Sequence, residues 1–136
     1  MKSKTKKQRN KESKEKGISF PASLLKPVGN FLSARLHSLQ KRKKAVENAD
    51  PFKDTARVLD NASPDTDAAE QFGHASNSAV KNQLDRAIIQ TRKALTRLKL
   101  GKYAICEECG LMIDTDRLMI YPDATLCAKD AAKREK

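Results

Sequence analysis

Three cysteines and one aspartate near the C-terminal end of the chain are spaced like the ligands of a structural metal site. Cys106 and Cys109 are separated by two residues, and Cys127 follows Cys109 after 17 residues, with Asp130 three positions further on. A two-residue gap lets one tight turn present both thiolates to one ion, and Gly110 suits such a turn because glycine adopts positive φ readily. The second pair has the spacing expected of a hairpin that returns to the same ion. The sequence therefore predicts a zinc site with three thiolates and one carboxylate.

Other interpretations of these residues remain open. Three cysteines are also compatible with small buried residues, or with one disulfide and one free thiol. A C-x-x-C pair can be a redox motif, but that motif usually opens a helix within a βαβ unit, and the sequence shows no such unit. Asp130 is either the fourth ligand or a bystander at a site completed by water. Its position matches the missing cysteine and carboxylates are zinc ligands, which favours ligation.

The composition is that of one domain, or of one small domain with extensions. The chain has 136 residues, a formal charge of +11 and 4% aromatic residues without Trp, so a large aromatic core is not expected. It contains no run of about 18 apolar residues, which predicts no membrane association, and its basic start lacks the apolar stretch of a secretory signal. We expect a cytoplasmic protein, in which thiols stay reduced and can bind metal.

Basic residues are concentrated at the N-terminus. Residues 2–16 contain eight Lys or Arg and two Glu, without apolar periodicity. Such a segment buries too little apolar surface to offset its ordering entropy, so residues 1–19 are predicted to form a disordered basic arm. Two roles remain open for the arm: it is a solvated tail, or it is attracted non-specifically to nucleic-acid phosphates or to an acidic protein surface.

Apolar residues three, four and seven positions apart predict two long helices. The first follows the apolar entry segment 20–25, has Pro27 in its first turn, and ends within residues 48–51, because the residue before a proline disfavours helical geometry. The second runs from about Asp67 to Leu100 and ends at Gly101. The apolar faces of the two helices consist of Leu25, Val28, Leu32, Leu36, Leu39 and Val46, and of Val80, Leu84, Ala87, Ile88, Thr91, Leu95 and Leu98.

These patterns predict a mainly α fold, a long antiparallel coiled-coil helical hairpin with a small C-terminal zinc-finger module. The hairpin takes residues 20–101, with its tip near 51–70, and the module takes residues 102–136. Within the module, residues 111–113 and 118–121 are predicted as short β-segments. His37 and His74 fall within the helices. His74 lies too far along its helix from the cysteines to be a ligand, and we expect surface or packing roles for both histidines.

Three sequence segments carry a family resemblance. They are the run GKYAICEECG over residues 101–110, the pair Arg117-Leu118, and the run PDATLC over residues 122–127. Together with the preceding hairpin they resemble the DksA/TraR zinc-finger family, whose usual site has four cysteines. The resemblance is close over the zinc module and extends over most of residues 20–130, but not over the basic arm.

The resemblance implies a bacterial transcription regulator that binds RNA polymerase directly, without sequence-specific DNA contact. In the family, the zinc end docks at the rim of the polymerase secondary channel, and the coiled coil brings an acidic tip near the catalytic magnesium. Some members act together with a nucleotide alarmone. The family tip reads Asp-x-x-Asp-x-Ala, whereas residues 65–70 read DTDAAE here, so Asp65 and Asp67 are the candidate tip acids at compressed spacing. Both also lie where a helix cap is expected.

We therefore expect a monomeric, non-enzymatic, zinc-binding regulator whose partner is RNA polymerase. The sequence shows no nucleophile–base pair and no phosphate-binding glycine loop. Glu107 and Glu108, between the first two cysteines, are expected to face solvent. The alternative function is a nucleic-acid- or ribosome-associated zinc module that uses residues 2–16, and a cysteine-based redox sensor is a third class.

Overall fold

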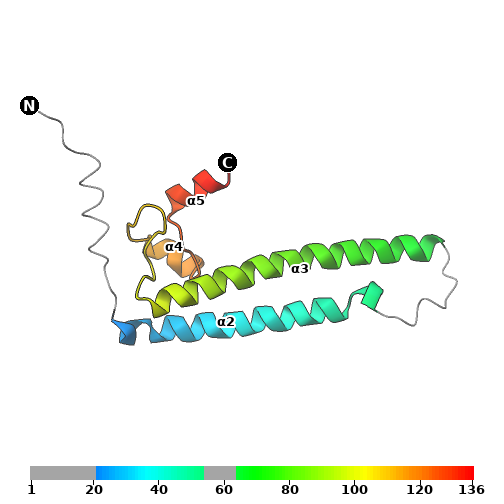
Figure 1. The fold of residues 1–136 in the computed structure, drawn as a ribbon, viewed down its shortest axis with the longest axis horizontal. Helices are drawn as coiled ribbons and strands as arrows, with labels where there is room; N and C mark the ends of the chain where they lie inside the picture. The colour runs from blue at the N-terminus through cyan, green and yellow to red at the C-terminus, as the bar shows by residue number, and fades with distance from the viewer. Residues whose placement is uncertain (1–20, 54–63) are drawn as a thin grey trace, which may run out of the picture. The chain divides into compact units, whose positions relative to one another are not determined.

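The computed structural model describes residues 21–53 and 64–136, and helices dominate this part of the chain (Figure 1). The elements are α2 (Ala22–Asn48), the short 3-10 helix η1 (Pro51–Lys53), α3 (Pro64–Lys99), α4 (Thr115–Ile120) and α5 (Ala128–Arg134). The β-type pairing within the described residues is one isolated antiparallel bridge between Ile105 and Met112. The predicted mainly α fold is confirmed. The predicted basic arm, residues 1–19, lies outside the described residues, and so do residues 54–63 of the predicted tip.

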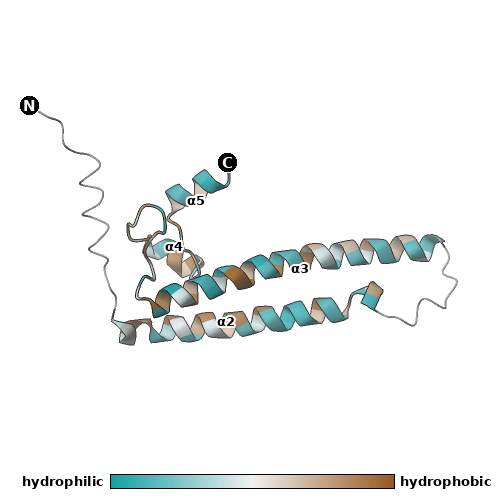
Figure 2. Cartoon of the chain, in the orientation of Figure 1, coloured by the Kyte–Doolittle hydropathy of each residue, from teal (hydrophilic) through white to brown (hydrophobic). Residues whose placement is uncertain are grey.

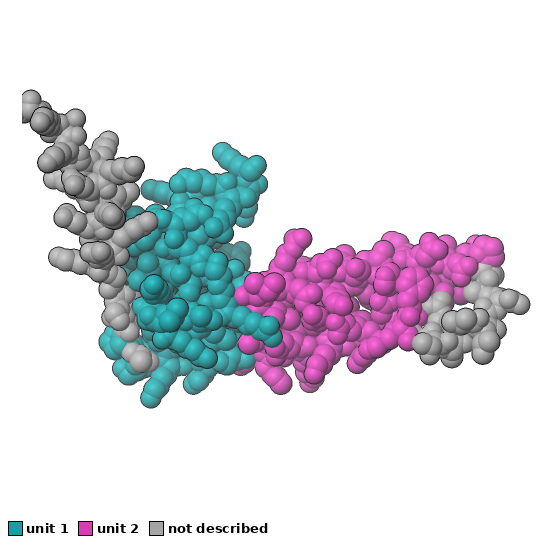
Figure 3. Space-filling model, viewed as in Figure 1, with its two compact units in different colours: residues 1–33, 90–136 teal, residues 34–89 magenta. Residues whose placement is uncertain are grey.

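The chain divides into two compact units (Figure 3). Unit 1 combines residues 1–33 with residues 90–136, and unit 2 consists of residues 34–89. Both α2 and α3 therefore contribute residues to each unit. Among the described residues, no helix has the length and apolar composition needed to cross a membrane.

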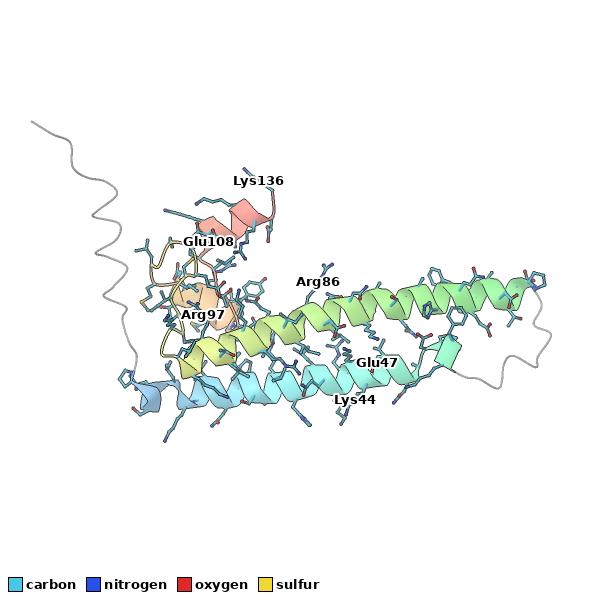
Figure 4. The ribbon with its side chains drawn as sticks, in the orientation of Figure 1. Lys44, Glu47, Arg86, Arg97, Glu108 and Lys136 are labelled. Carbon is cyan, nitrogen blue, oxygen red and sulfur yellow. The ribbon has the colours of Figure 1, made fainter. Side chains whose placement is uncertain are left out.

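In unit 2, residues of α2 and α3 pair in antiparallel order. Rising residue numbers on α2 and just after it meet falling numbers on α3 in Lys43–Asp85 at 2.6 Å, Glu47–Lys81 at 3.1 Å and Ala49–Asn77 at 3.1 Å. Glu47 is labelled on α2 in Figure 4. Leu84 and Ile88 of the predicted α3 face are buried here, whereas Val80 is exposed. The antiparallel pairing thus follows the predicted stripe at Leu84 and Ile88, and on the other side of Val80 it relies on polar contacts of Asn77 and His74.

Just after the end of α2, Asp50 contacts His74 of α3. The Nδ1 atom of His74 donates to the Asp50 carboxylate, 2.9 Å from both of its oxygens. The Phe52 ring packs on the His74 imidazole with ring centroids 4.5 Å apart, and the Phe52 amide donates to Asp50. This hydrogen bond from His74, followed by the one from the Phe52 amide, lowers the pKa of Asp50 below its usual value. His74 therefore has a packing role, as its sequence position predicted.

The lowered pKa of Asp50 predicts a pH-dependent contribution to stability. Because the folded-state pKa is depressed, the contribution is present above the unfolded-state value of 3.8 and is lost as pH falls through the folded-state pKa. We expect Asp50→Asn to lower the melting temperature at pH 7, and the gap to wild type to narrow below about pH 4. Thermal melts followed by circular dichroism between pH 7 and pH 3 measure this gap. A gap that stays constant over this range would contradict the prediction.

The core of unit 1 joins the two helices to the first residues of the C-terminal module. Leu25 and Leu32 of α2 and Ala94 of α3 are buried together with Tyr103 and Ala104. Hydrophilic residues predominate along both helices, and hydrophobic residues are interspersed among them in the sequence of each helix (Figure 2). Partly buried residues complete this core, namely Val28, Leu95, Leu98 and Leu118. The first residues after α3 are thus anchored to the same core as the helices.

The boundaries of α2 and α3 differ from the predicted ones by a few residues. Since α2 begins at Ala22, Pro27 lies in the second turn instead of the first. There it removes one backbone hydrogen bond of the helix. The second helix begins at Pro64, three residues before the predicted start, and Gly101 follows its end with a φ of 70°, as predicted.

The prediction of a β-segment over residues 118–121 is wrong, because Thr115–Ile120 forms the helix α4. Asp114 is its N-cap, and its carboxylate accepts a hydrogen bond from the Asp116 amide at 3.2 Å. Such a cap satisfies an otherwise unpaired amide of the first turn. The predicted segment over residues 111–113 is reduced to the single bridge at Met112. Residues 128–134 form the helix α5.

Candidate metal centre

The four predicted ligands lie together. Cys106 and Cys109 belong to the loop after α3, Cys127 is the N-cap residue of α5, and Asp130 lies in the first turn of α5. One potential ligand atom from each residue is within 4.8 Å of the others. Residues more than 20 positions apart in sequence are thereby brought to one point, as the spacing predicted.

Backbone hydrogen bonds shape the loop that presents the first two thiols. The Gly110 amide donates to the Cys106 carbonyl at 3.1 Å, and the Cys106 amide donates to the Leu111 carbonyl at 2.8 Å. Gly110 has a φ of 69°, which confirms the predicted need for glycine at this turn. Ala104, just before the loop, also has a positive φ, 64°, an uncommon conformation for a residue with a side chain. The burial of Ala104 in the core of unit 1 holds it there.

The distances within the cluster fit a tetrahedral zinc site. With Zn–S bonds of about 2.3 Å, two thiolates of a tetrahedron lie about 3.8 Å apart. The Sγ atoms of Cys109 and Cys127 are 3.9 Å apart. The Oδ2 atom of Asp130 lies 3.2 Å from Sγ of Cys106 and of Cys127, slightly inside the separation of about 3.6 Å that a thiolate and a carboxylate ligand would have. Three soft sulfur atoms and one oxygen form a donor set that suits zinc.

Asp130 is buried, and both of its oxygens have partners. Oδ2 faces the thiols, and Oδ1 accepts a hydrogen bond from the Lys133 ammonium at 2.9 Å. The contact with Lys133, followed by those with Cys127 and Cys106, lowers the pKa of the Asp130 carboxyl well below its usual range. The same contact raises the pKa of Lys133. The carboxylate is therefore held in its charged form, which is the form that binds metal.

Polar side chains of α3 hold the segment that leads to Cys127. Gln90 Nε2 donates to the Asp123 carbonyl at 2.8 Å, and the hydroxyl of Thr91 donates to the Asp123 carboxylate at 3.4 Å. Thr91, Asp123 and Thr125 are all buried, so these bonds lie inside unit 1. Sequence reasoning placed Thr91 in an apolar stripe and missed this role, because the partners of a polar residue have no sequence signature.

The expectation that Glu107 and Glu108 face solvent is wrong for Glu107, which is half-buried, whereas Glu108 is exposed. Lys93 and Arg97 of α3 contact the Glu107 carboxylate at 2.6 Å and 3.4 Å. Arg97 also donates to the Ile105 carbonyl at 2.6 Å. Glu108, although exposed, pairs with Arg134 of α5 at 2.8 Å. Figure 4 labels Arg97 and Glu108. The two glutamates between the cysteines therefore join the loop to α3 and to α5.

The remaining candidate residues are not part of the cluster. Asp65 and Asp67 lie in the first turn of α3, and both side chains are exposed. His37 is exposed on α2, and His74 binds Asp50. The first-turn position of both aspartates also suits the positive end of the helix dipole.

Comparisons with known proteins agree with the geometry of the module. Residues 101–136 match the family model of the prokaryotic dksA/traR C4-type zinc finger. The structure of transcription factor DksA2 from Pseudomonas aeruginosa is similar, with a TM-score of 0.66 and 21% sequence identity over 94% of this chain and 95% of that chain. At this identity the similarity establishes a common fold. A search of curated protein sequences gave no match.

The matched segment contains all four clustered residues. The family model that matches it describes a zinc finger with four cysteines. The present chain has three. Residues 101–136 are therefore a zinc-finger module of the dksA/traR type, in which Asp130 stands in the position of the fourth cysteine.

Proposed function

We propose that the protein is a transcription regulator that binds RNA polymerase directly, in the manner of secondary-channel regulators, and makes no sequence-specific contact with DNA. One observation carries the proposal: a dksA/traR-type zinc finger occurs on a fold shared, over 94% of the chain, with a protein described as a transcription factor. The site and its surroundings suit a binding protein, since the clustered side chains provide four ligands and thus close a tetrahedral metal site.

We propose that Cys106, Cys109, Cys127 and Asp130 hold the zinc ion. A closed zinc site contributes folding energy and cross-links its ligands. The residues themselves support this role, because the cluster brings the loop after α3 to the first turn of α5, and the Glu108–Arg134 pair joins the same loop to the last turn of α5. The ion would then fix α5 against the loop.

The surface proposed to contact the polymerase lies on unit 1. A groove of about 390 Å³ is lined almost wholly by apolar side chains of α2, α4 and the module: Pro27, Val28, Phe31, Tyr103, Thr115, Leu118, Met119 and Pro122. Phe31 and Met119 are exposed, Met119 to 79%. Exposed apolar patches are typical of protein interaction sites. We expect the polymerase to cover this groove.

Asp65 and Asp67 are proposed as the acidic tip. Their exposure in the first turn of α3 leaves both carboxylates accessible to a partner. If docking uses unit 1 while these acids act at the catalytic centre, substitutions at the two places should have different effects. Changes at the tip should affect transcription, and changes in the groove should affect binding.

The test uses two double variants. Asp65→Asn with Asp67→Asn should leave polymerase affinity nearly unchanged and abolish the effect on transcription initiation. Phe31→Ser with Met119→Ser should weaken polymerase binding, because both side chains are exposed and lie in the groove. Affinity is measured with purified polymerase, and activity by transcription in vitro. Circular dichroism checks that both variants keep their helices.

Two results would count against the proposal. Unchanged transcription with the folded Asp65/Asp67 variant would reduce these aspartates to residues that stabilise the start of α3. Capture from lysate of nuclease-sensitive material, without polymerase subunits, would favour the alternative of a nucleic-acid-associated zinc module that uses residues 2–16.

A further inference from the structure

The two carboxylate oxygens of Asp130 have separate partners. Oδ2 lies 3.2 Å from the Sγ atoms of Cys106 and Cys127, on the side of the thiols. Oδ1 lies 2.9 Å from the ammonium of Lys133, three residues further along α5. One oxygen is thus directed into the cluster, while a cation holds the other.

The burial of the two side chains differs strongly. The Asp130 side chain is 5% exposed and the Lys133 side chain is 73% exposed. Lys133 therefore covers the buried carboxylate from the solvent side with its charge, while its own ammonium stays hydrated. Such an arrangement resembles the outer-shell partners that orient carboxylate ligands in metal sites.

The charge of the site gives this partner a second effect. Three thiolates and one carboxylate carry four negative charges, which leaves a net charge of −2 around Zn2+. The Lys133 ammonium reduces this net charge to −1 at contact distance from the one ligand that is not a thiolate. A site with four thiolates has no carboxylate for such a lysine to hold.

We propose that Lys133 is a positioning residue for the zinc ion. It holds Oδ1 of Asp130, so that Oδ2 alone is presented to the metal and the carboxylate binds through one oxygen. This inference rests on Asp130 being a zinc ligand and on no contact with RNA polymerase. The competing explanation is that Lys133 only stabilises α5 through a pair one helical turn apart.

The first experiment measures zinc release from the full-length, zinc-loaded protein to a chromophoric chelator in excess. Lys133→Gln should release zinc about tenfold faster than wild type, the lower end of the range for outer-shell partners, because Lys133 is largely exposed. Lys133→Arg should release zinc almost as slowly as wild type, since arginine keeps the positive charge. Lys129→Gln is the matched control, an exposed lysine on the same helix, and should behave like wild type.

The second experiment separates positioning from helix stability. In the Asp130→Cys background, Lys133→Gln should have no effect on zinc release, because the oxygen it holds is gone. With Co2+ in place of zinc, Lys133→Gln should change the visible absorption bands of the metal, which report ligand geometry, and Lys129→Gln should leave them unchanged.

Three outcomes would overturn the proposal: equal release rates for wild type and Lys133→Gln, an equal effect of Lys133→Gln with Cys at position 130, or an unchanged cobalt spectrum. None of these measurements involves polymerase, so their failure is distinct from failure of the proposed regulatory function.

Discussion

Leu32→Ala is expected to lower the free energy of unfolding by about 2–5 kcal/mol. Leu32 is fully buried, at 0% exposure, in the core that α2 shares with Ala94, Tyr103 and Ala104. Truncation removes apolar side-chain atoms from this core and leaves a cavity, because the packed side chains around it relax only partly. Because the same core anchors the first residues of the module, the loss should affect both the helices and the zinc finger. Urea denaturation followed by circular dichroism measures the change.

Leu24→Ala is the matched control for this prediction. Leu24 lies on the same helix but is 68% exposed, so its truncation should change the free energy of unfolding by no more than about 0.5 kcal/mol. Similar losses for both variants would mean that the two positions are equally buried and that the packing of α2 on α3 in unit 1 differs from the one described here.

The two long helices were accessible from sequence because their apolar period repeats over many turns. The predicted start of α3 was three residues late, because proline commonly marks a turn or the interruption of a helix and α3 begins at Pro64. Proline is also favoured in the first turn of a helix, where its missing amide costs nothing. A helix that begins at Pro64 was therefore also compatible with the sequence. At the other end, Gly101 marked the end of α3 correctly. A glycine directly after a long apolar stripe is typical of a helix C-terminus, where a positive φ is needed.

The secondary structure of the module was harder to predict. The run Leu118–Tyr121 is too short for its apolar residues to distinguish a strand from a helix. The deciding feature was local: Asp114 caps α4 by accepting from the Asp116 amide. A capping aspartate and a turn aspartate have the same sequence appearance, so the cap at Asp114 was recognisable only in the structure.

The metal ligands were predictable, whereas their supports were not. Ligand spacing is fixed by the reach of one turn, which leaves a trace in sequence. The bonds from Gln90 and Thr91 to the segment before Cys127, and from Lys93 and Arg97 to Glu107, join residues whose separation follows from the fold alone. Lys133 could be predicted in part. Its position three residues after Asp130 allows an ion pair within a helix, but the link to the metal site depends on Asp130 lying in the cluster.

Zinc removal and substitution of Asp130 should have the largest effect on the C-terminal module. The buried residues of the module itself are few, namely Tyr103, Ala104, Cys106, Ile113, Asp123, Thr125 and Asp130. A module with so small a core depends on its metal for stability, because binding free energy is also folding free energy. A chelator should therefore lower the melting temperature of the module, and elemental analysis of protein purified without chelator should give about one zinc per chain.

Substitutions at Asp130 test its ligation directly. Asp130→Ala should leave three thiolates with an open fourth position, and zinc release to a chelator should accelerate by more than about 100-fold, since loss of an outer-shell partner alone typically costs 10–100-fold. Asp130→Cys should restore four thiolates and slow the release, because sulfur is the softer donor. Lys129→Gln is a suitable control, since Lys129 is an exposed residue beside Asp130 on α5 and lies outside the cluster. Equal release rates for wild type and Asp130→Ala would exclude coordination by Asp130. The site would then be one of three thiolates, and the buried carboxylate would serve as the hydrogen-bond acceptor for Lys133.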